Sequence, residues 1–133
     1  LKKSKSINIF MVNNIKVDFV NYKYKWLDEI YFEDNIRMAT AKDIAAMKIN
    51  AITGRGSKKD FIDLYFLLKE FSLREMMDFY NRKYTDGSEF MVCKSLSFFE
   101  DADTELDVKM YQNFNWKTCK QEIIKELISL SSD

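Results

Sequence analysis

Two short β-rich runs separated by two asparagines constrain the fold of this chain more than any other feature. The runs are residues 7–12 (INIFMV) and 15–20 (IKVDFV), with Asn13 and Asn14 between them. Because asparagine tolerates a positive φ, the pair predicts a two-residue turn of the primed type and hence a β-hairpin. Pairing across this turn sets Asp18 opposite Ile9, so that a carboxylate lies among apolar neighbours. Such an acid either reaches the edge of the sheet or has a functional role.

After the hairpin, the sequence changes from strand patterns to helix patterns. Two further short strands are expected at residues 29–32 and 36–39. Residues 89–99 are apolar and fit either a strand or a helix, and the acidic residues 100–107 are expected to form a solvated loop. Helices are predicted over residues 41–53, 58–70, 73–83 and 117–130. A hairpin followed by helices is an α+β fold, with a strand-rich region at residues 1–39 and a helical region at residues 40–133.

Capping residues mark where these helices begin and end. Residues 40–43 (TAKD) read as a capping box with Asp43 in the usual glutamate position, and residues 72–75 (SLRE) read as another. Gly54 is predicted at the C′ position of the helix at residues 41–53. Ser57 is the predicted N-cap of the helix that follows.

The absence of histidine from the 133 residues excludes several kinds of chemistry. A Ser–His–Asp triad, a Cys–His pair and an H-E-x-x-H zinc site all require that side chain.

Balanced charge, with 21 basic and 21 acidic residues, argues against binding nucleic acid by charge alone. Two cysteines are too few for a disulfide framework, and we expect reduced, buried thiols in a cytoplasmic protein. The sequence contains no run of 18 apolar residues, so no membrane span is predicted. The first residue is Leu rather than Met, and we expect the chain to be a piece of a longer one.

One lysine falls inside the apolar stripe predicted for the helix at residues 41–53. Lys48 lies four residues after Ile44 and four before Ile52, and Met47 and Ala51 complete the stripe. A lysine there must either extend to solvent or meet a negative partner. Asp60 and Asp63, which share a face of the next helix, invite pairing with it. That pair either stabilises the fold or positions a phosphate.

Residues 54–57 (GRGS) lead directly into a helix N-terminus. Two glycines, Arg55 and free backbone N–H groups can form an anion-binding cradle, although a helix–helix turn whose glycines serve geometry is the better interpretation. Tyr22, Tyr24 and Trp26 alternate with lysines, a pattern typical of base stacking, but an ordinary strand or loop is the simpler interpretation. The pairs at residues 76–77 (MM) and 98–99 (FF) are predicted to belong to the core.

Residues 48–64 (KINAITGRGSKKDFIDL) resemble the AbiEii-type nucleotidyltransferase toxins of the polymerase-β-like superfamily. The family pattern is K-x-x-A-x-x-x-R-x-x-x-[KR]-D-x-x-D-L, preceded here by residues 42–48 (KDIAAMK). The strand at residues 15–20 is similar to the strand that carries the family's third carboxylate. The acidic loop and the tryptophan-bearing final helix resemble the family's C-terminal end. Residues 1–39 would then be part of a nucleotidyltransferase sheet.

The resemblance implies transfer of a nucleotide from an NTP to an RNA acceptor such as tRNA, with Mg²⁺ as the cofactor and a cognate antitoxin as a partner. Asp18 would be a metal ligand on a strand facing the Lys48 helix, and Lys48 would bind the triphosphate. Arg55 and Lys59 would assist in phosphate binding. Asp60 and Asp63 would orient Lys48 or support the catalytic site.

The sequence also departs from the family pattern. A Gly-Ser turn followed by a D-x-D strand supplies the family's primary metal ligands, and the 133 residues contain no such arrangement. The two Gly-Ser pairs lack a following D-x-D strand, and residues 101–103 (DAD) lie in the acidic stretch. The chain alone is therefore expected to be inactive. Two alternatives stay open: an inactive remnant or interaction module, and a metal-dependent nuclease built on Asp18 and Lys48.

Overall fold

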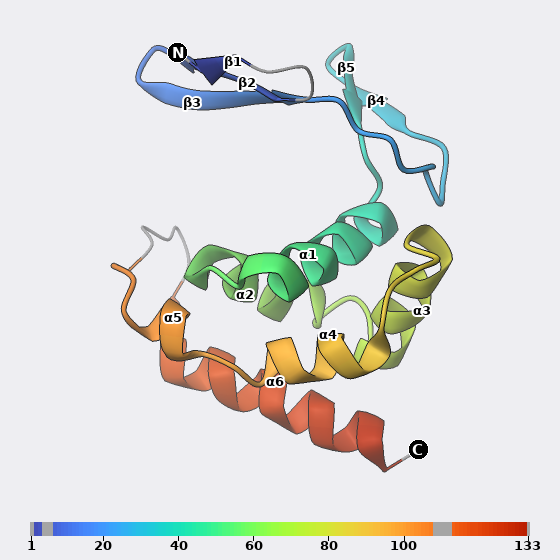
Figure 1. Cartoon of the computed structure of the whole chain (residues 1–133), viewed down its shortest axis with the longest axis vertical. Coiled ribbons are helices and arrows are strands. Elements are labelled where there is room, and N and C mark those ends of the chain that lie inside the picture. Colours follow the sequence, from blue (N-terminus) through green and yellow to red (C-terminus); the bar gives the residue numbers. More distant parts are fainter. Residues whose placement is uncertain (1, 4–6, 108–112, 133) are drawn as a thin grey trace.

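Two small antiparallel sheets lie at one end of the molecule, and a bundle of helices lies at the other (Figure 1). The structure is a computed structural model and describes residues 2–3, 7–107 and 113–132. The predicted α+β class, with short N-terminal strands followed by helices, is confirmed. The strands are β1 (Lys2–Lys3), β2 (Ile7–Val12), β3 (Ile15–Val20), β4 (Tyr31–Glu33) and β5 (Ile36–Met38). The helices are α1 (Ala41–Arg55), α2 (Lys58–Leu67), α3 (Leu73–Lys83), α4 (Glu89–Leu96), α5 (Glu100–Asp103) and α6 (Trp116–Ser131).

Strands β2 and β3 form the predicted hairpin. Its two turn residues have positive φ, 50° at Asn13 and 63° at Asn14, as a primed turn requires. The register pairs Ile9 with Asp18, which confirms the predicted facing. Strand β1 pairs with the outer edge of β2 and completes a sheet of order β1-β2-β3.

Strands β4 and β5 form a second hairpin of the same kind. The turn residues Asp34 and Asn35 have φ of 50° and 64°, and Glu33 pairs with Ile36 directly across the turn. The two short strands expected here are confirmed, but β4 begins two residues later than predicted and the tight turn was not foreseen. Asp-Asn is a less familiar signal than Asn-Gly, although both side chains tolerate positive φ for the same reason.

The turn of the first hairpin gives a direct test of its register. We expect Asn14→Val to weaken the hairpin by about 1–2 kcal/mol, because a β-branched residue is strained at positive φ, whereas Asn14→Gly keeps the turn. Asn14 is exposed, so packing is unchanged in both variants. Hydrogen exchange of the β2 and β3 amides measures the difference. Equal exchange in the valine and glycine variants would contradict the turn assignment.

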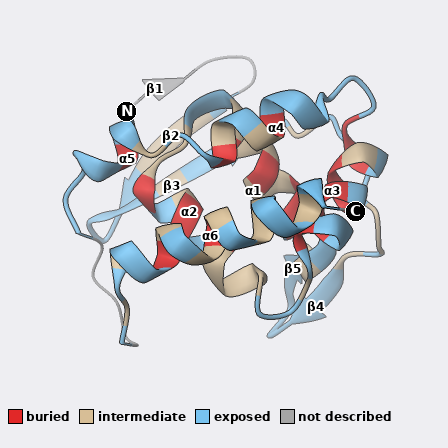
Figure 2. Ribbon diagram, turned by 90° about the horizontal axis from the view of Figure 1, so that it is seen from below, coloured by how far each residue is buried: buried red, intermediate tan, exposed pale blue. Residues whose placement is uncertain are grey.

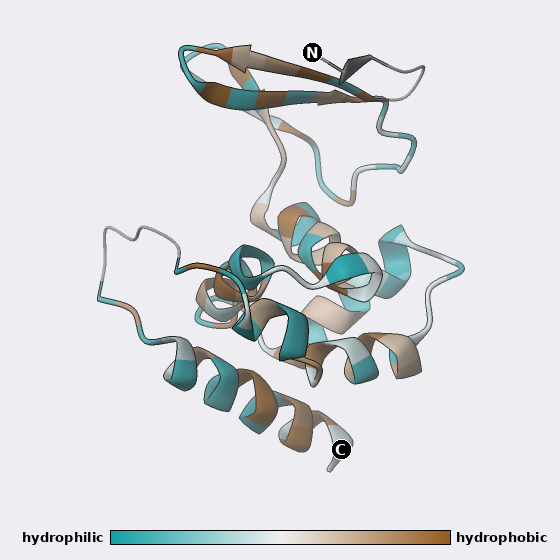
Figure 3. Cartoon of the chain, turned by 60° about the vertical axis from the view of Figure 1, so that its left-hand side comes forward, coloured by the Kyte–Doolittle hydropathy of each residue, from teal (hydrophilic) through white to brown (hydrophobic). Residues whose placement is uncertain are grey.

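Strands β2 and β3 contain many hydrophobic residues (Figure 3), and large apolar side chains are exposed on both faces of the sheet. Ile15 and Phe19 on one face are 65% and 61% exposed, and Met11 and Val20 on the other are 66% and 55% exposed. Large apolar side chains exposed on both faces are typical of a sheet that is covered from both sides.

Helix α1 is central to the bundle and packs against α2, α3 and α4. Its buried face consists of Ala45, Ala46, Ile49 and Ile52 (Figure 2). The predicted stripe was partly wrong, since Ile44 is 36% exposed and the core face is rotated away from it. The two alanines allow the backbones of α1 and its neighbours to approach closely, and a stripe chosen for bulky residues misses such a face. The core prediction for residues 76–77 is confirmed, because Met76 and Met77 are fully buried.

The helix boundaries agree with the capping signals in α2 and α3 and disagree in α1. Ser57 caps α2 and accepts a hydrogen bond from the Asp60 N–H, and Ser72 and Glu75 form both bonds of a capping box. The capping box predicted at the start of α1 is wrong, because Thr40 makes no side-chain cap bond to the backbone. The predicted C′ glycine is also wrong. Helix α1 continues through Gly54 to Arg55.

The segments left open or assigned to loops are partly helical. Residues 89–96 form α4, and the acidic stretch predicted as a loop begins with the short helix α5, in which Ala102 is fully buried. Burial of this one apolar residue folds the acidic stretch onto the bundle. Across the parts of the chain that the structure describes, no helix has both the length and the apolar character needed to cross a membrane.

Candidate functional site

Lys48 lies between two aspartates of the adjacent helix. Its Nζ is 2.8 Å from Asp63 Oδ2 and 3.2 Å from Asp60 Oδ1. The predicted pairing across α1 and α2 is therefore confirmed. The lysine side chain is 27% exposed and that of Asp60 is 14% exposed, whereas that of Asp63 is 49% exposed. The cluster thus opens to solvent on the side of Asp63.

The start of α2 fixes the geometry of this cluster. Ser57 donates from Oγ to Asp60 Oδ2 over 2.8 Å, which leaves Oδ1 of the same carboxylate for Lys48. An aspartate in the first turn also interacts favourably with the helix dipole. Burial lowers the pKa of Lys48, but the hydrogen bonds and charges of Asp63 and Asp60 outweigh it and raise that pKa above its ordinary value. The ammonium group therefore stays charged at neutral pH, oriented and partly open to an incoming anion.

Asp18 lies outside this cluster. Its Oδ2 is 3.4 Å from Lys16 Nζ on the same strand, and its side chain is 43% exposed. The hairpin that carries it stands apart from α1 and α2 in Figure 1. Within the described residues, no hydrogen bond or ion pair joins Asp18 to Lys48. A metal-binding role for Asp18 stays a prediction.

The two other predicted phosphate-binding residues lie on either side of the link between α1 and α2. Arg55 ends α1, is exposed and lines a cavity together with Gly54 and Gly56. Lys59 is exposed in the first turn of α2. Neither side chain makes a hydrogen bond or an ion pair with any residue that the structure describes, and both are exposed to solvent.

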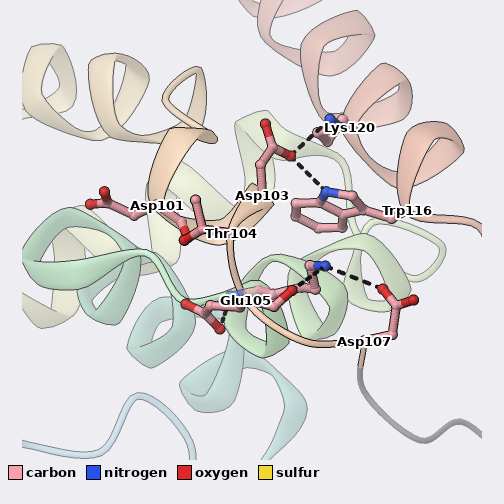
Figure 4. A network of polar contacts seen from close by, with 8 residues as sticks. Asp101, Asp103, Thr104, Glu105, Asp107, Trp116 and Lys120 are labelled. Carbon is pink, nitrogen blue, oxygen red and sulfur yellow. Dashed lines mark hydrogen bonds and ion pairs between the residues drawn. The ribbon is translucent and has the colours of Figure 1, made fainter.

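The N-terminus of α2 already holds an anion supplied by the chain itself (Figure 4). The backbone N–H of Lys58 donates to Glu105 Oε2 over 3.1 Å, and Lys58 Nζ contacts the Glu105 carbonyl at 2.9 Å and Asp107 Oδ1 at 3.2 Å. The same ammonium group lies 5.2 Å from the centre of the Trp116 ring. The anion bound at the start of α2 is thus a carboxylate of the acidic stretch, and Lys58 holds it; the anion cradle at residues 54–57 stays a prediction.

Asp103 joins the acidic stretch to α6 (Figure 4). Its Oδ1 accepts from Trp116 Nε1 at 2.8 Å and lies 2.9 Å from Lys120 Nζ. The hydrogen bond from Lys120, followed by that from Trp116, lowers the pKa of Asp103 below its ordinary value. Residues 101–103 are helical rather than extended, so they do not form the D-x-D strand of a metal site.

A buried ion pair that the sequence reasoning missed connects the bundle to the segment after the hairpin. Lys83 Nζ lies 2.6 Å from Asp43 Oδ1, and both side chains are fully buried. Asp43 also accepts hydrogen bonds from the N–H groups of Leu27 and Asp28. Lys83 donates to the Lys25 carbonyl, and its Nζ is 4.6 Å from the centre of the Trp26 ring. The available signal was the acid at the third helical position of α1, which the capping-box interpretation had already assigned.

The described residues do not by themselves fit a magnesium site. Mg²⁺ prefers several oxygen ligands in near-octahedral geometry. Among residues 2–3, 7–107 and 113–132, no three His, Cys, Asp or Glu side chains are placed to hold one metal ion. Asp60 and Asp63 share a carboxylate–lysine cluster instead. Any metal ligands contributed by Asp18 would need partners from outside this set.

The described residues thus form an α+β fold in which a lysine of α1 is held between two aspartates of α2 and is partly exposed to solvent. Comparison with family models identifies the family. The model described as nucleotidyl transferase AbiEii toxin, type IV TA system, matches residues 10–127, and the chain belongs to this family.

A relative from Aquifex aeolicus (strain VF5), described as an uncharacterized protein, is 40% identical over 117 residues. The match covers 84% of this chain and 57% of the relative, so the chain spans little more than half the length of that protein. No solved structure matches the chain.

Proposed function

We propose that this chain forms the C-terminal part of a nucleotidyltransferase toxin that moves a nucleotide from an NTP to an RNA acceptor. The observation that carries the proposal is the Lys48 cluster. It lies within the matched range, and its two aspartates come from the adjacent helix. A lysine held charged and partly exposed is suited to bind a triphosphate, because an ammonium group acts as a point charge on phosphate oxygens.

Each residue of the cluster has a separate task in this proposal. Lys48 contacts the triphosphate, while Asp60 and Asp63 hold its ammonium group in place and keep it protonated. When phosphate oxygens replace the exposed Asp63 as the partner of Lys48, the more buried Asp60 still fixes the direction of the side chain. Lys59, whose side chain has no ion-pair partner among the described residues, adds positive potential at the start of α2.

The exposed sheet supports the view that further polypeptide completes the catalytic fold. Both faces of the β2–β3 hairpin expose large apolar side chains, as expected of a sheet covered on both sides. In this proposal the covering polypeptide carries a Gly-Ser turn followed by a D-x-D strand, an arrangement that these 133 residues lack. That strand supplies the primary ligands for Mg²⁺. In this proposal Asp18 is the Mg²⁺ ligand that this chain contributes. A cognate antitoxin is the proposed protein partner, as in a type IV toxin–antitoxin system.

Substitution of Lys48 tests the proposal in the native full-length polypeptide. We expect Lys48→Met to lower nucleotide transfer from α-³²P-labelled NTP to RNA by roughly a hundredfold or more, because a charge aimed at the reacting phosphates is lost. Asp63→Asn should lower transfer less, since Asp60 still orients the lysine. Label retained on RNA after gel electrophoresis is the measurement.

Lys125→Met is the matched control, since Lys125 is exposed on α6 and distant in sequence from the cluster. Full transfer activity in the Lys48→Met variant would refute the proposal. Two other outcomes would replace the proposal with one of the alternatives. Cleavage of RNA or DNA that needs Mg²⁺ but no NTP would identify a nuclease. Tight binding of a protein partner without any Mg²⁺–NTP binding by calorimetry identifies an interaction module.

A further inference from the structure

A cavity of about 500 Å³ lies between the C-terminal end of α1 and the helices α4 and α5. Its volume falls in the range of ligand pockets, roughly 300–1,000 Å³. The lining combines cationic, apolar, hydroxyl and acidic side chains. The members that carry the argument below are Gly54, Arg55, Lys94, Phe98 and Asp101. The Lys48 cluster is not part of this cavity.

Two cations that make no ion pair with any described residue line the cavity. Arg55 enters from the last turn of α1 and Lys94 from α4, and neither side chain has a hydrogen bond or ion pair with any described residue. Beside them, Gly54 leaves open space, because a Cβ at that position would meet no atom within 4 Å. Two cations in the lining of one cavity, next to open backbone, provide a place for a phosphate group.

An aromatic ring and a free carboxylate complete the lining. Phe98 was predicted to belong to the core, but it is 49% exposed at the cavity. The Asp101 side chain makes no hydrogen bond or ion pair with any residue that the structure describes, and it points away from the Asp103–Trp116–Lys120 group (Figure 4). A carboxylate in the same cavity disfavours a plain polyanion. It favours a ligand that also donates hydrogen bonds, as ribose hydroxyls and base amino groups do.

We propose that this cavity binds one nucleotide unit, with its phosphate on Arg55 and Lys94, its base against Phe98 and a ribose or base donor on Asp101. The inference rests on the proposed function and assigns the position of a second nucleotide in it. Arg55 follows Lys48 by seven residues, about two turns or ~10.5 Å along the same side of α1. The phosphate-binding role expected for Arg55 is therefore moved from the Lys48 cluster to the cavity.

The nucleotide has two possible sources, a free nucleotide and a unit within an RNA strand, and a binding experiment separates them. The 133-residue chain is titrated into a 5′-fluorescein-labelled tetraribonucleotide in EDTA, and anisotropy is followed. AMP and inorganic phosphate are then used as competitors. If AMP displaces the labelled strand at micromolar-to-millimolar concentrations similar to those needed of unlabelled tetranucleotide, the ligand is a free nucleotide. If AMP displaces it much more weakly, the ligand is a unit within an RNA strand.

Three variants test the lining. We expect Arg55→Gln and Lys94→Gln each to weaken binding about five- to tenfold at low salt and to lower the salt slope by about 0.7. Phe98→Leu should weaken binding on the order of tenfold, because a stacked base loses its aromatic partner. Lys125→Gln, which removes a charge from exposed α6, is the control and should bind like the wild type. All four side chains are exposed, so the thermal unfolding curves should coincide.

Unchanged binding in the Arg55→Gln and Lys94→Gln variants would overturn the assignment, and so would an equal loss in Lys125→Gln. Displacement by inorganic phosphate as effective as by AMP would show that no nucleoside is recognised. Because the assay contains neither Mg²⁺ nor NTP, it is independent of catalysis. A chain that binds here but shows no Lys48-dependent transfer in its native polypeptide would separate this site from the proposed reaction.

Discussion

Replacing Lys83 by methionine is expected to destabilise the fold by about 3–5 kcal/mol, because the change leaves the Asp43 carboxylate buried without its counter-charge. The carboxylate keeps only the N–H donors of the segment after the hairpin and the Thr40 hydroxyl at 3.3 Å. Urea unfolding followed by circular dichroism measures the loss. A second substitution gives the mechanism: Asp43→Asn added to Lys83→Met should recover part of the stability, since it removes the unpaired charge but keeps an acceptor for the Leu27 N–H.

The contribution of Asp43 to stability should depend on pH with opposite signs in the wild type and in the Lys83→Met variant. In the wild type, burial raises the pKa of Asp43, but the hydrogen bond from Lys83 and those from Leu27 and Asp28 outweigh it, and the pKa lies below its ordinary value. The pair therefore stabilises the fold above the unfolded-state pKa of about 3.9, and this contribution is lost as the pH falls through the lower folded pKa. In Lys83→Met the buried carboxylate is unpaired, its folded pKa rises, and the deficit relative to wild type shrinks on acidification.

Lys42 provides a matched control for this experiment. It precedes Asp43 in α1, carries the same charge and pairs with Asp28 at 3.7 Å, but its side chain is 46% exposed. We expect Lys42→Met to cost less than about 1 kcal/mol, as is usual for a surface ion pair. Losses of equal size in Lys42→Met and Lys83→Met would contradict the special cost of breaking the buried pair.

Local signals were sufficient for most elements of the fold. The Asn13–Asn14 turn specified the register of β2 and β3, and Ser57 and Ser72 specified the starts of α2 and α3. These signals depend on backbone preferences within a few residues. The errors arose where tertiary contacts overrode local preference. Asp43 pairs with Lys83 instead of completing a capping box at the start of α1. The acidic stretch is partly helical because Ala102 is buried.

The candidate site divides in the same way. The pairing of Lys48 with Asp60 and Asp63 was predictable, because helix periodicity placed a lysine in one apolar stripe and an acid at the margin of the next. The engagement of Glu105 at the N-terminus of α2 was not, because 47 residues separate it from Lys58. Likewise, nothing local distinguishes the exposed Phe98 from the partly buried Phe99. Their difference comes from the packing of α4, α5 and α6.

Phe61→Ala is the second substitution with a large expected effect, about 3–5 kcal/mol lost from the free energy of unfolding. Phe61 is fully buried and its ring lies 5.0 Å from that of Phe99 and 6.2 Å from that of Trp116, measured between centroids. Phe61 thus packs α2 against Phe99, just before α5, and against Trp116 at the start of α6. Truncation opens a cavity that rigid neighbouring helices cannot fill.

The same ring also explains why residue 56 is glycine. A Cβ on Gly56 would come within 2.8 Å of the Phe61 ring. We therefore expect Gly56→Ala to destabilise the wild type by about 1–3 kcal/mol, as overpacking does, but to cost much less in the Phe61→Ala background, where the ring is gone. Phe90→Ala, at a residue that is 74% exposed, is the control and should change stability by less than about 0.5 kcal/mol. Additive losses from Gly56→Ala and Phe61→Ala, measured by urea unfolding, would show that the glycine is not selected by this contact.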